Sequence, residues 1–211
     1  MNIWEIENNF YLKSNVSRLN KALCQYELFK QTSNIPGDII ECGVFKGISL
    51  IRLLTFRDLL IKKVKKKVIG FDAFGKFPKQ KIKEDQKFAR SHDKSSGYGI
   101  SHNQLNKILI SKKFKNFQLI KGDIKKTLPK FLERNKKLKI SFLHLDMDVY
   151  EPTKFALEYL FSKVSKNGII LIDDYKNVKG ATKATDSFLK KNSKLKIKNL
   201  DFNKRLSFFK K

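Results

Sequence analysis

Apolar residues along the chain occur either in short runs or at helical spacing. Segments that read as strands lie at 38–43, 67–72, 117–123, 138–148, 168–175, 194–200 and 205–211. Segments with apolar residues at helical spacing lie at 47–63, 100–111, 124–135, 152–166 and 180–191. This alternation predicts an α/β fold, in which a mostly parallel sheet carries helices on both faces and the last two strands close it.

Two further segments complete the predicted organisation. Residues 1–34 have helical spacing up to the break at SNIPGD (33–38), so we expect an N-terminal helical extension followed by a single domain at 35–211. Residues 73–100 are rich in Lys, Gly and Ser and have no clear period. A loop of that length is usually functional or mobile, and we expect it to act as a mobile lid.

The sequence favours a cytoplasmic location. No apolar run approaches the roughly 18 residues that a membrane helix needs. The N-terminus, MNIWEIENNF, has acids where a secretory signal would carry positive charge. The two cysteines, Cys24 and Cys42, cannot build a disulfide framework, which agrees with a reducing compartment.

Basic residues dominate the charge, with 46 Lys and Arg against 20 Asp and Glu and a net charge of +26. Such an excess raises the alternative of a nucleic-acid-binding protein or an RNA methyltransferase that uses a basic surface. However, only six of these residues are arginine, the residue whose planar fork suits phosphate and base recognition. The lysines occur in almost every segment. We therefore attribute the charge mainly to a general compositional bias of the source organism and not to a binding surface, which disfavours a nucleic-acid partner.

Acidic residues are scarce, yet they concentrate at the ends of the predicted strands. These acids are Glu41, Asp72, Asp123, Asp146, Asp148, Asp173 and Asp174. Helix caps and turns explain one or two of them, but not four carboxylates at the ends of two consecutive strands. Their mutual repulsion calls for a positive partner. A hard divalent cation such as Mg²⁺ is favoured, and a lysine cluster is the rival.

The turn ECGVFKG (41–47) follows the first predicted strand and opens a helix. Its glycines, Gly43 and Gly47, let the backbone approach a ligand closely. The spacing is neither the dinucleotide fingerprint nor a phosphate loop. With Asp72 about 30 residues later, it suits a nucleoside whose ribose is held by a carboxylate and that carries no pyrophosphate. S-adenosylmethionine is such a ligand.

Several segments together resemble the macrocin O-methyltransferase family. They are ECGVFKGIS (41–49), GFDAFGKFP (70–78), KGDI (121–124), LHLDMDVYEPT (143–153), GIILIDDY (168–175) and GATKATDSF (180–188). The resemblance implies a Rossmann-like class I methyltransferase fold with a seven-stranded sheet and an antiparallel C-terminal strand. It also implies Mg²⁺-dependent transfer of a methyl group from S-adenosylmethionine to a sugar hydroxyl, on a nucleotide sugar, a glycan or a glycosylated natural product.

The resemblance assigns roles to individual residues. It implies that Asp146, Asp173 and Asp174 hold the metal and that Asp148 is the general base. It places Glu41 and Gly43 at the methionine side of the cofactor, Asp72 at the ribose and Asp123 near the adenine. The chain departs from the family at DAFGKFP (72–78), where the family pattern is D-x-F-x-G-L-P.

The remaining candidates carry two interpretations each. His144 stands two residues before Asp146 and either borders the site or is a satisfied core histidine. His92 and His102 flank or lie in the expected lid and are either exposed polar residues or substrate contacts. Some of the positive charge could attract an anionic acceptor. The N-terminal helices are candidates for contacts in a homo-oligomer.

Overall fold

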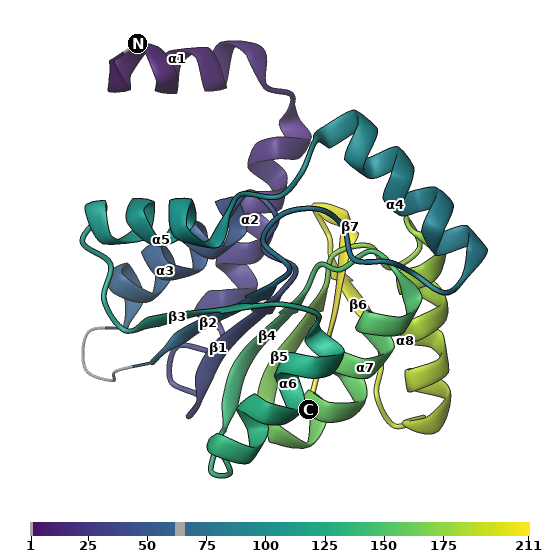
Figure 1. Cartoon of the computed structure of the whole chain (residues 1–211). Helices are drawn as coiled ribbons and strands as arrows, with labels where there is room; N and C mark the ends of the chain where they lie inside the picture. The colour runs from purple at the N-terminus through teal and green to yellow at the C-terminus, as the bar shows by residue number, and fades with distance from the viewer. Residues whose placement is uncertain (1, 62–65) are drawn as a thin grey trace.

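The described residues, 2–61 and 66–211 of a computed structural model, contain one seven-stranded sheet (Figure 1). Its strands are β1 (Asp38–Cys42), β2 (Val68–Asp72), β3 (Phe117–Lys121), β4 (Ile140–Leu145), β5 (Val164–Ile172), β6 (Lys198–Leu200) and β7 (Asn203–Lys210). The order is β3-β2-β1-β4-β5-β7-β6, with β1 to β5 parallel and β7 antiparallel to both neighbours. The predicted fold is confirmed.

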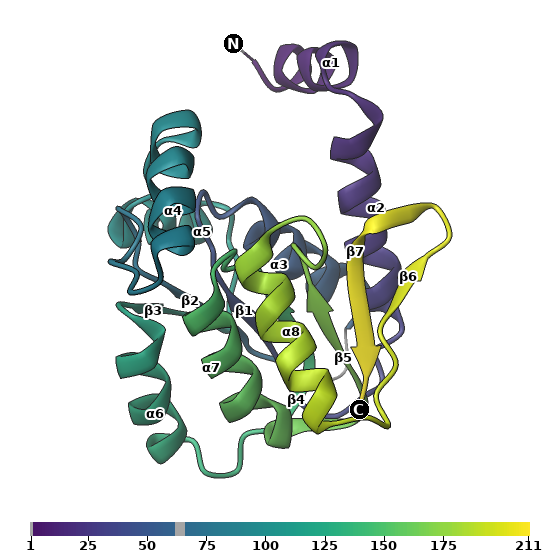
Figure 2. The same cartoon turned by 90° about the vertical axis from the view of Figure 1, so that its right-hand side faces the viewer.

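Helices cover both faces of this sheet (Figures 1 and 2). The α-helices of the described residues are α1 (Ile3–Lys13), α2 (Val16–Lys30), α3 (Ile48–Leu60), α4 (Lys83–Ser96), α5 (His102–Ser111), α6 (Ile124–Arg134), α7 (Tyr150–Leu160) and α8 (Lys179–Lys191). One face carries α2, α3 and α5, and the other carries α6, α7 and α8. Successive strand residues point to opposite faces, so each strand contributes side chains to the hydrophobic core on both faces of the sheet.

Buried apolar residues form one cluster on each face. In β1, Ile39 packs with α2, α3 and α5, whereas Ile40 packs with α6, α7 and α8. In β4, Phe142 and Leu143 divide in the same way. Strands that are apolar on both sides therefore produce the continuous runs seen in the sequence.

The N-terminal segment, expected to be helical over 1–34, is divided in two. It contains two helices, and Asn15 caps the second by accepting a hydrogen bond from the backbone N–H of Ser17. The helix α2 buries residues such as Leu28 and Phe29 in the core, whereas α1 buries none of its residues. In Figure 2, α1 stands away from the sheet. Subunit contacts through these helices stay a prediction.

The segment 73–100 is not irregular throughout, because it contains α4. Acids in the first turn, Glu84 and Asp85, favour this helix, and Gly97 follows its last residue at φ 70°. The role of the segment as a mobile lid stays a prediction. Elsewhere, α7 ends earlier than expected and β5 begins at Val164. Of the helix predicted over 47–63, residues 62 and 63 lie outside the described residues.

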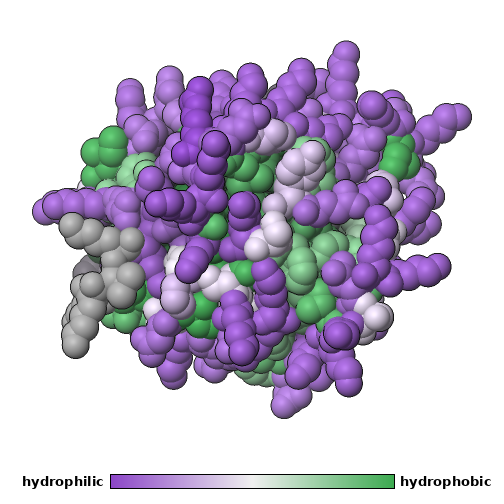
Figure 3. Space-filling view, turned by 90° about the horizontal axis from the view of Figure 1, so that it is seen from below, coloured by the Kyte–Doolittle hydropathy of each residue, from purple (hydrophilic) through white to green (hydrophobic). Residues whose placement is uncertain are grey.

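Hydrophilic side chains are spread over the face of the molecule seen from below, with apolar residues between them (Figure 3). This distribution agrees with the scattered lysines of the sequence. No helix in the described part of the chain is long and apolar enough to cross a membrane.

Candidate functional site

The carboxyl ends of the parallel strands border a cavity of about 1310 Å³. Gly43 after β1, Asp72 at the end of β2, Asp146 after β4 and Asp173 after β5 all line it. The strand order reverses between β1 and β4, and open parallel sheets bind ligands at such a point.

Four aspartates converge at this edge, as the sequence predicted. Ligand oxygens of Asp146, Asp148 and Asp174 lie within 4.8 Å of one another, and a second group joins Asp146 with Asp173 and His144. Asp148 adopts φ 63°, a left-handed conformation that a non-glycine residue tolerates at some cost. The tight turn after β4 thus brings two acids of the D-x-D motif to the same cluster.

Burial and mutual repulsion shift the acidity of this cluster. Burial, together with Asp146, Asp148 and Asp173, raises the pKa of Asp174 to about 10. Burial and Asp173 raise the pKa of Asp146 to about 7, and burial raises that of Asp148. Burial also acts on Asp173, but His144 and Lys21 outweigh it and hold its pKa well below the usual range. The pKa values of the neighbouring residues Asp173 and Asp174 are therefore shifted in opposite directions.

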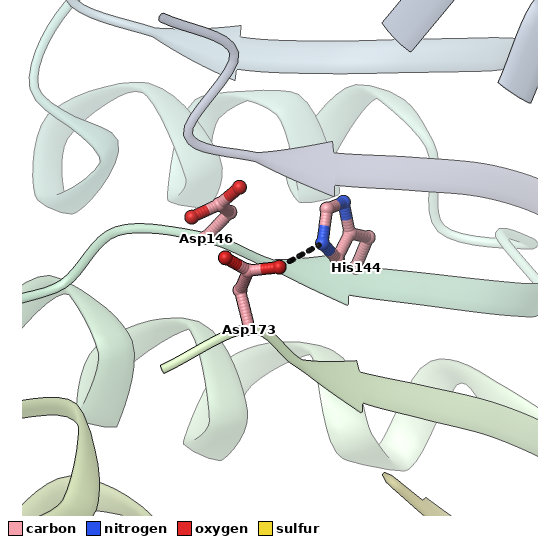
Figure 4. A group of neighbouring side chains, drawn as sticks. All are labelled: His144, Asp146 and Asp173. Carbon is pink, nitrogen blue, oxygen red and sulfur yellow. Dashed lines mark ion pairs between the residues drawn. The ribbon is translucent and has the colours of Figure 1, made fainter. Parts of the chain in front are cut away.

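A buried histidine connects this cluster to β1. His144 and Glu41 are fully buried, and His144 Nδ1 lies 2.8 Å from Glu41 Oε1. His144 Nε2 lies 3.7 Å from Asp173 Oδ1 (Figure 4), and the two ring nitrogens thus face the carboxylates of Glu41 and Asp173. Burial lowers the pKa of His144, but Asp173 and Glu41 outweigh it and raise the pKa to about 10. His144 is thus a core histidine that also borders the acidic cluster.

Lys21, a residue that the sequence did not single out, reaches the same acids from α2. Its Nζ lies 2.8 Å from Asp173 Oδ2 and 3.4 Å from Asp146 Oδ2. On the far side, Arg205 lies 3.9 Å from Asp174 Oδ1. A lysine was the rival to a metal ion as the positive partner, and Lys21 occupies that position. One lysine among so many carries no sequence signal, because only the fold brings α2 to this edge.

The glycine turn packs directly against the D-x-D segment. Gly43 has φ 91°, and a Cβ there would lie 1.8 Å from the carbonyl oxygen of Asp146. Asp72 holds the turn, since its Oδ2 accepts hydrogen bonds from the N–H groups of Val44 at 2.8 Å and Phe45 at 3.0 Å. Gly43 thus brings the predicted cofactor turn into contact with the acidic segment, and Asp72 fixes the conformation of that turn.

The other predicted cofactor residues have varied surroundings. Asp123 lines the cavity and caps α6 by accepting from the N–H of Lys125. Gly47 has φ 82°, and a Cβ there would lie 2.6 Å from Leu105. Neither Gly47 nor Glu41 is among the described residues that line the cavity. The side chain of Glu41 is directed to His144 instead.

Aromatic side chains from α4 and its approach form another wall of the cavity. Phe45, Phe77, Phe88 and His92 all line it, and the rings of Phe88 and His92 stack with centroids 6.0 Å apart. His92 Nδ1 is buried and has no hydrogen-bond partner among the described residues. His102 packs against Phe74 outside this lining. Of the two histidines that flank or lie in 73–100, His92 is the one positioned to contact a ligand.

A family model described as Macrocin-O-methyltransferase (TylF) matches residues 17–211. The chain belongs to the macrocin O-methyltransferase family. The match covers nearly all the residues described above, from α2 with Lys21 to β7.

One relative has a name that agrees with this family assignment. Over 167 residues the chain is 27% identical to demethyldecarbamoylnovobiocin O-methyltransferase of Streptomyces niveus, covering 74% of this chain and 59% of that protein. The chain thus spans about three fifths of that relative's length.

Solved structures share the fold. The calicheamicin methyltransferase CalS11 has a TM-score of 0.77 at 21% identity, over 100% of this chain and 86% of that chain. The O-methyltransferase NovP has a TM-score of 0.74 at 22% identity, over 91% of this chain and 79% of that chain. At these identities the likeness supports the fold alone.

Proposed function

We propose that this protein transfers a methyl group from S-adenosylmethionine to a hydroxyl of a sugar or sugar-containing metabolite, with a divalent cation such as Mg²⁺. The observation that carries the proposal is the convergence of Asp146, Asp148 and Asp174 within 4.8 Å in a cavity that Gly43 also lines, in a member of this family.

The donor set suits a hard cation. All four aspartates offer oxygen ligands, which Mg²⁺ prefers, and Asp173 Oδ1 is a buried oxygen without a hydrogen-bond partner among the described residues. In this proposal Asp146, Asp173 and Asp174 hold the cation. When bound, the cation supplies Lewis acidity that lowers the pKa of the acceptor hydroxyl. S-adenosylmethionine supplies the methyl group, with Gly43, Gly47, Asp72, Asp123 and Glu41 as the residues proposed to hold or support it.

Asp148 is the proposed general base. An acceptor hydroxyl beside the cluster gives its proton to the Asp148 carboxylate as the oxygen forms its bond to the methyl carbon and the carbon–sulfur bond breaks. Such help contributes about 10²–10⁴-fold to a rate. An aspartate with an ordinary pKa near 3.9 is a weak base, so the pKa of Asp148, which burial raises, improves the match.

The cavity walls favour an acceptor with negative charge. Three of the six arginines in the chain, Arg18, Arg52 and Arg205, line the cavity. The relative CalS11 is also described as a TDP-rhamnose 3'-O-methyltransferase, and a nucleotide sugar carries such charge. We therefore propose nucleotide sugars as the first acceptors to examine. Family membership disfavours the alternative of nucleic-acid binding, and so do the few arginines.

Calorimetry and a methyl-transfer assay test the proposal together. The protein is titrated with S-adenosylmethionine with and without Mg²⁺, and nucleotide sugars are then screened with labelled cofactor. We expect Asp148→Asn to bind the cofactor like the wild type and to lose about 10²–10⁴-fold in turnover. Asp201→Asn, at an exposed turn, is the matched control. Full turnover in Asp148→Asn would remove Asp148 as the base, and absence of cofactor binding by the wild type would refute the function.

A further inference from the structure

Lys21 is held rigidly at the edge of the acidic cluster by its own helix. One turn further along α2, Cys24 and Gln25 are buried, and two turns further Leu28 and Phe29 are buried in the core. These anchors fix the backbone of Lys21, and its side chain, 28% exposed, extends to the cavity. The ammonium group is therefore placed by the fold and not by a chance surface contact.

The ammonium contacts the oxygens that a cation would need. Its Nζ lies 2.8 Å from Asp173 Oδ2 and 3.4 Å from Asp146 Oδ2, and both aspartates are proposed metal ligands. Two positive charges cannot share these oxygens without strong repulsion, because they would lie within a few ångströms of each other beside the nearly buried Asp173. The flexible four-carbon stem of lysine lets the ammonium withdraw into the open cavity.

We propose that Lys21 is an internal competitor of the divalent cation: it neutralises Asp146 and Asp173 in the cation-free protein and is displaced when the cation binds. This inference rests on the proposed function, because it assumes that these aspartates hold a cation. It adds a residue that sets how tightly the cation is held.

Mn²⁺ alone is the probe, measured as free ion by electron paramagnetic resonance at fixed pH and ionic strength without cofactor or acceptor. Replacing Lys21 by methionine keeps the length and removes the charge. We expect Lys21→Met to bind Mn²⁺ at least about tenfold more tightly than the wild type. Lys21→Arg keeps the charge, so we expect its Mn²⁺ affinity to stay near that of the wild type. Lys30→Met, an exposed lysine of the same helix, is the control and is also expected to leave the affinity unchanged.

A second readout guards against loss of folding. The thermal midpoint of each variant is measured with and without Mn²⁺, and we expect the Mn²⁺-induced rise to be larger in Lys21→Met than in the wild type. Equal or weaker Mn²⁺ binding by folded Lys21→Met overturns the competition. If the wild type still shows Mg²⁺-dependent methyl transfer in that case, the proposed function stands and only the role of Lys21 fails. Absence of Mn²⁺ binding in every variant overturns the competition as well, and the methyl-transfer assay then decides the function separately.

Discussion

Replacing Glu41 by glutamine tests the buried pair behind the acidic cluster. Glutamine keeps the shape of the side chain and its acceptor oxygen but removes the charge, so His144 loses the carboxylate that lies 2.8 Å from its Nδ1. Removing one member of a buried ion pair costs about 3–5 kcal/mol. Because Asp173 still faces the other ring nitrogen at 3.7 Å, we expect the lower end, about 3 kcal/mol, in the free energy of unfolding.

The raised pKa of His144 determines how the stabilisation by this pair changes with pH. Although burial lowers the pKa of His144, its carboxylate neighbours raise it to about 10, above the value near 6.5 expected in the unfolded chain. The pair therefore stabilises the fold fully below a pH of about 6.5, and this contribution is lost as the pH rises toward about 10. In Glu41→Gln we expect less of this decline, because less stabilisation remains to be lost.

Urea unfolding at a pH of about 6 and again at about 9 measures both effects. Glu133→Gln, on the exposed side of α6, is the control and should change the unfolding free energy by less than about 0.5 kcal/mol. The reasoning is refuted if Glu41→Gln at the lower pH stays within that margin of the wild type and follows the same pH slope. Titration with S-adenosylmethionine then tells separately whether Glu41 also supports the cofactor.

Two further substitutions test the cofactor side of the cavity. For Gly43→Ala we expect a loss of more than about 4 kcal/mol in urea unfolding, because its Cβ would lie 1.8 Å from the carbonyl oxygen of Asp146; stability within about 1 kcal/mol of the wild type would contradict this packing. For Asp72→Asn we expect a loss of about 1–3 kcal/mol and about tenfold weaker binding of S-adenosylmethionine by calorimetry, because an amide satisfies the N–H groups of Val44 and Phe45 less well than a carboxylate. Unchanged cofactor affinity would remove Asp72 from the binding site.

The order of strands and helices could be predicted because it depends on local patterns. Period and apolar runs located β1 to β5 and the helices between them, except α4. The rule that parallel strands end at one edge then brought Asp146, Asp148, Asp173 and Asp174 together before any geometry was known. Both steps need only neighbouring residues and a general property of parallel sheets.

Features that depend on distant partners could not be predicted in this way. The contact of Lys21 with Asp173 joins residues 152 positions apart, and the pair of His144 with Glu41 joins residues 103 positions apart. By contrast, α4 and the break before Asn15 left local signals, namely acids in a first turn and a polar helix cap. These signals did not decide the prediction, because α4 is strongly polar and because the helical spacing continues on both sides of Asn15.

The net charge of the whole chain and the local charge of the acidic cluster have opposite signs. Although the chain carries +26, four of its 20 acids meet at one sheet edge. Near neutral pH the chain itself offsets much of the cluster's negative charge, because burial and its neighbours raise the pKa of Asp174 to about 10 while Lys21, His144 and the nearby Arg205 supply positive charge.

A divalent cation bound as proposed would enter a site whose charge is already largely balanced, and the positive field of the whole protein would oppose its approach. In the proposed competition the cation would displace Lys21, so its affinity would depend on the contact of Lys21 with Asp173 as well as on the carboxylates. An anionic acceptor experiences the opposite field and is attracted to the cavity. The dispersed lysines, which have no pattern of a recognition surface, would thus support the proposed anionic acceptor through long-range attraction.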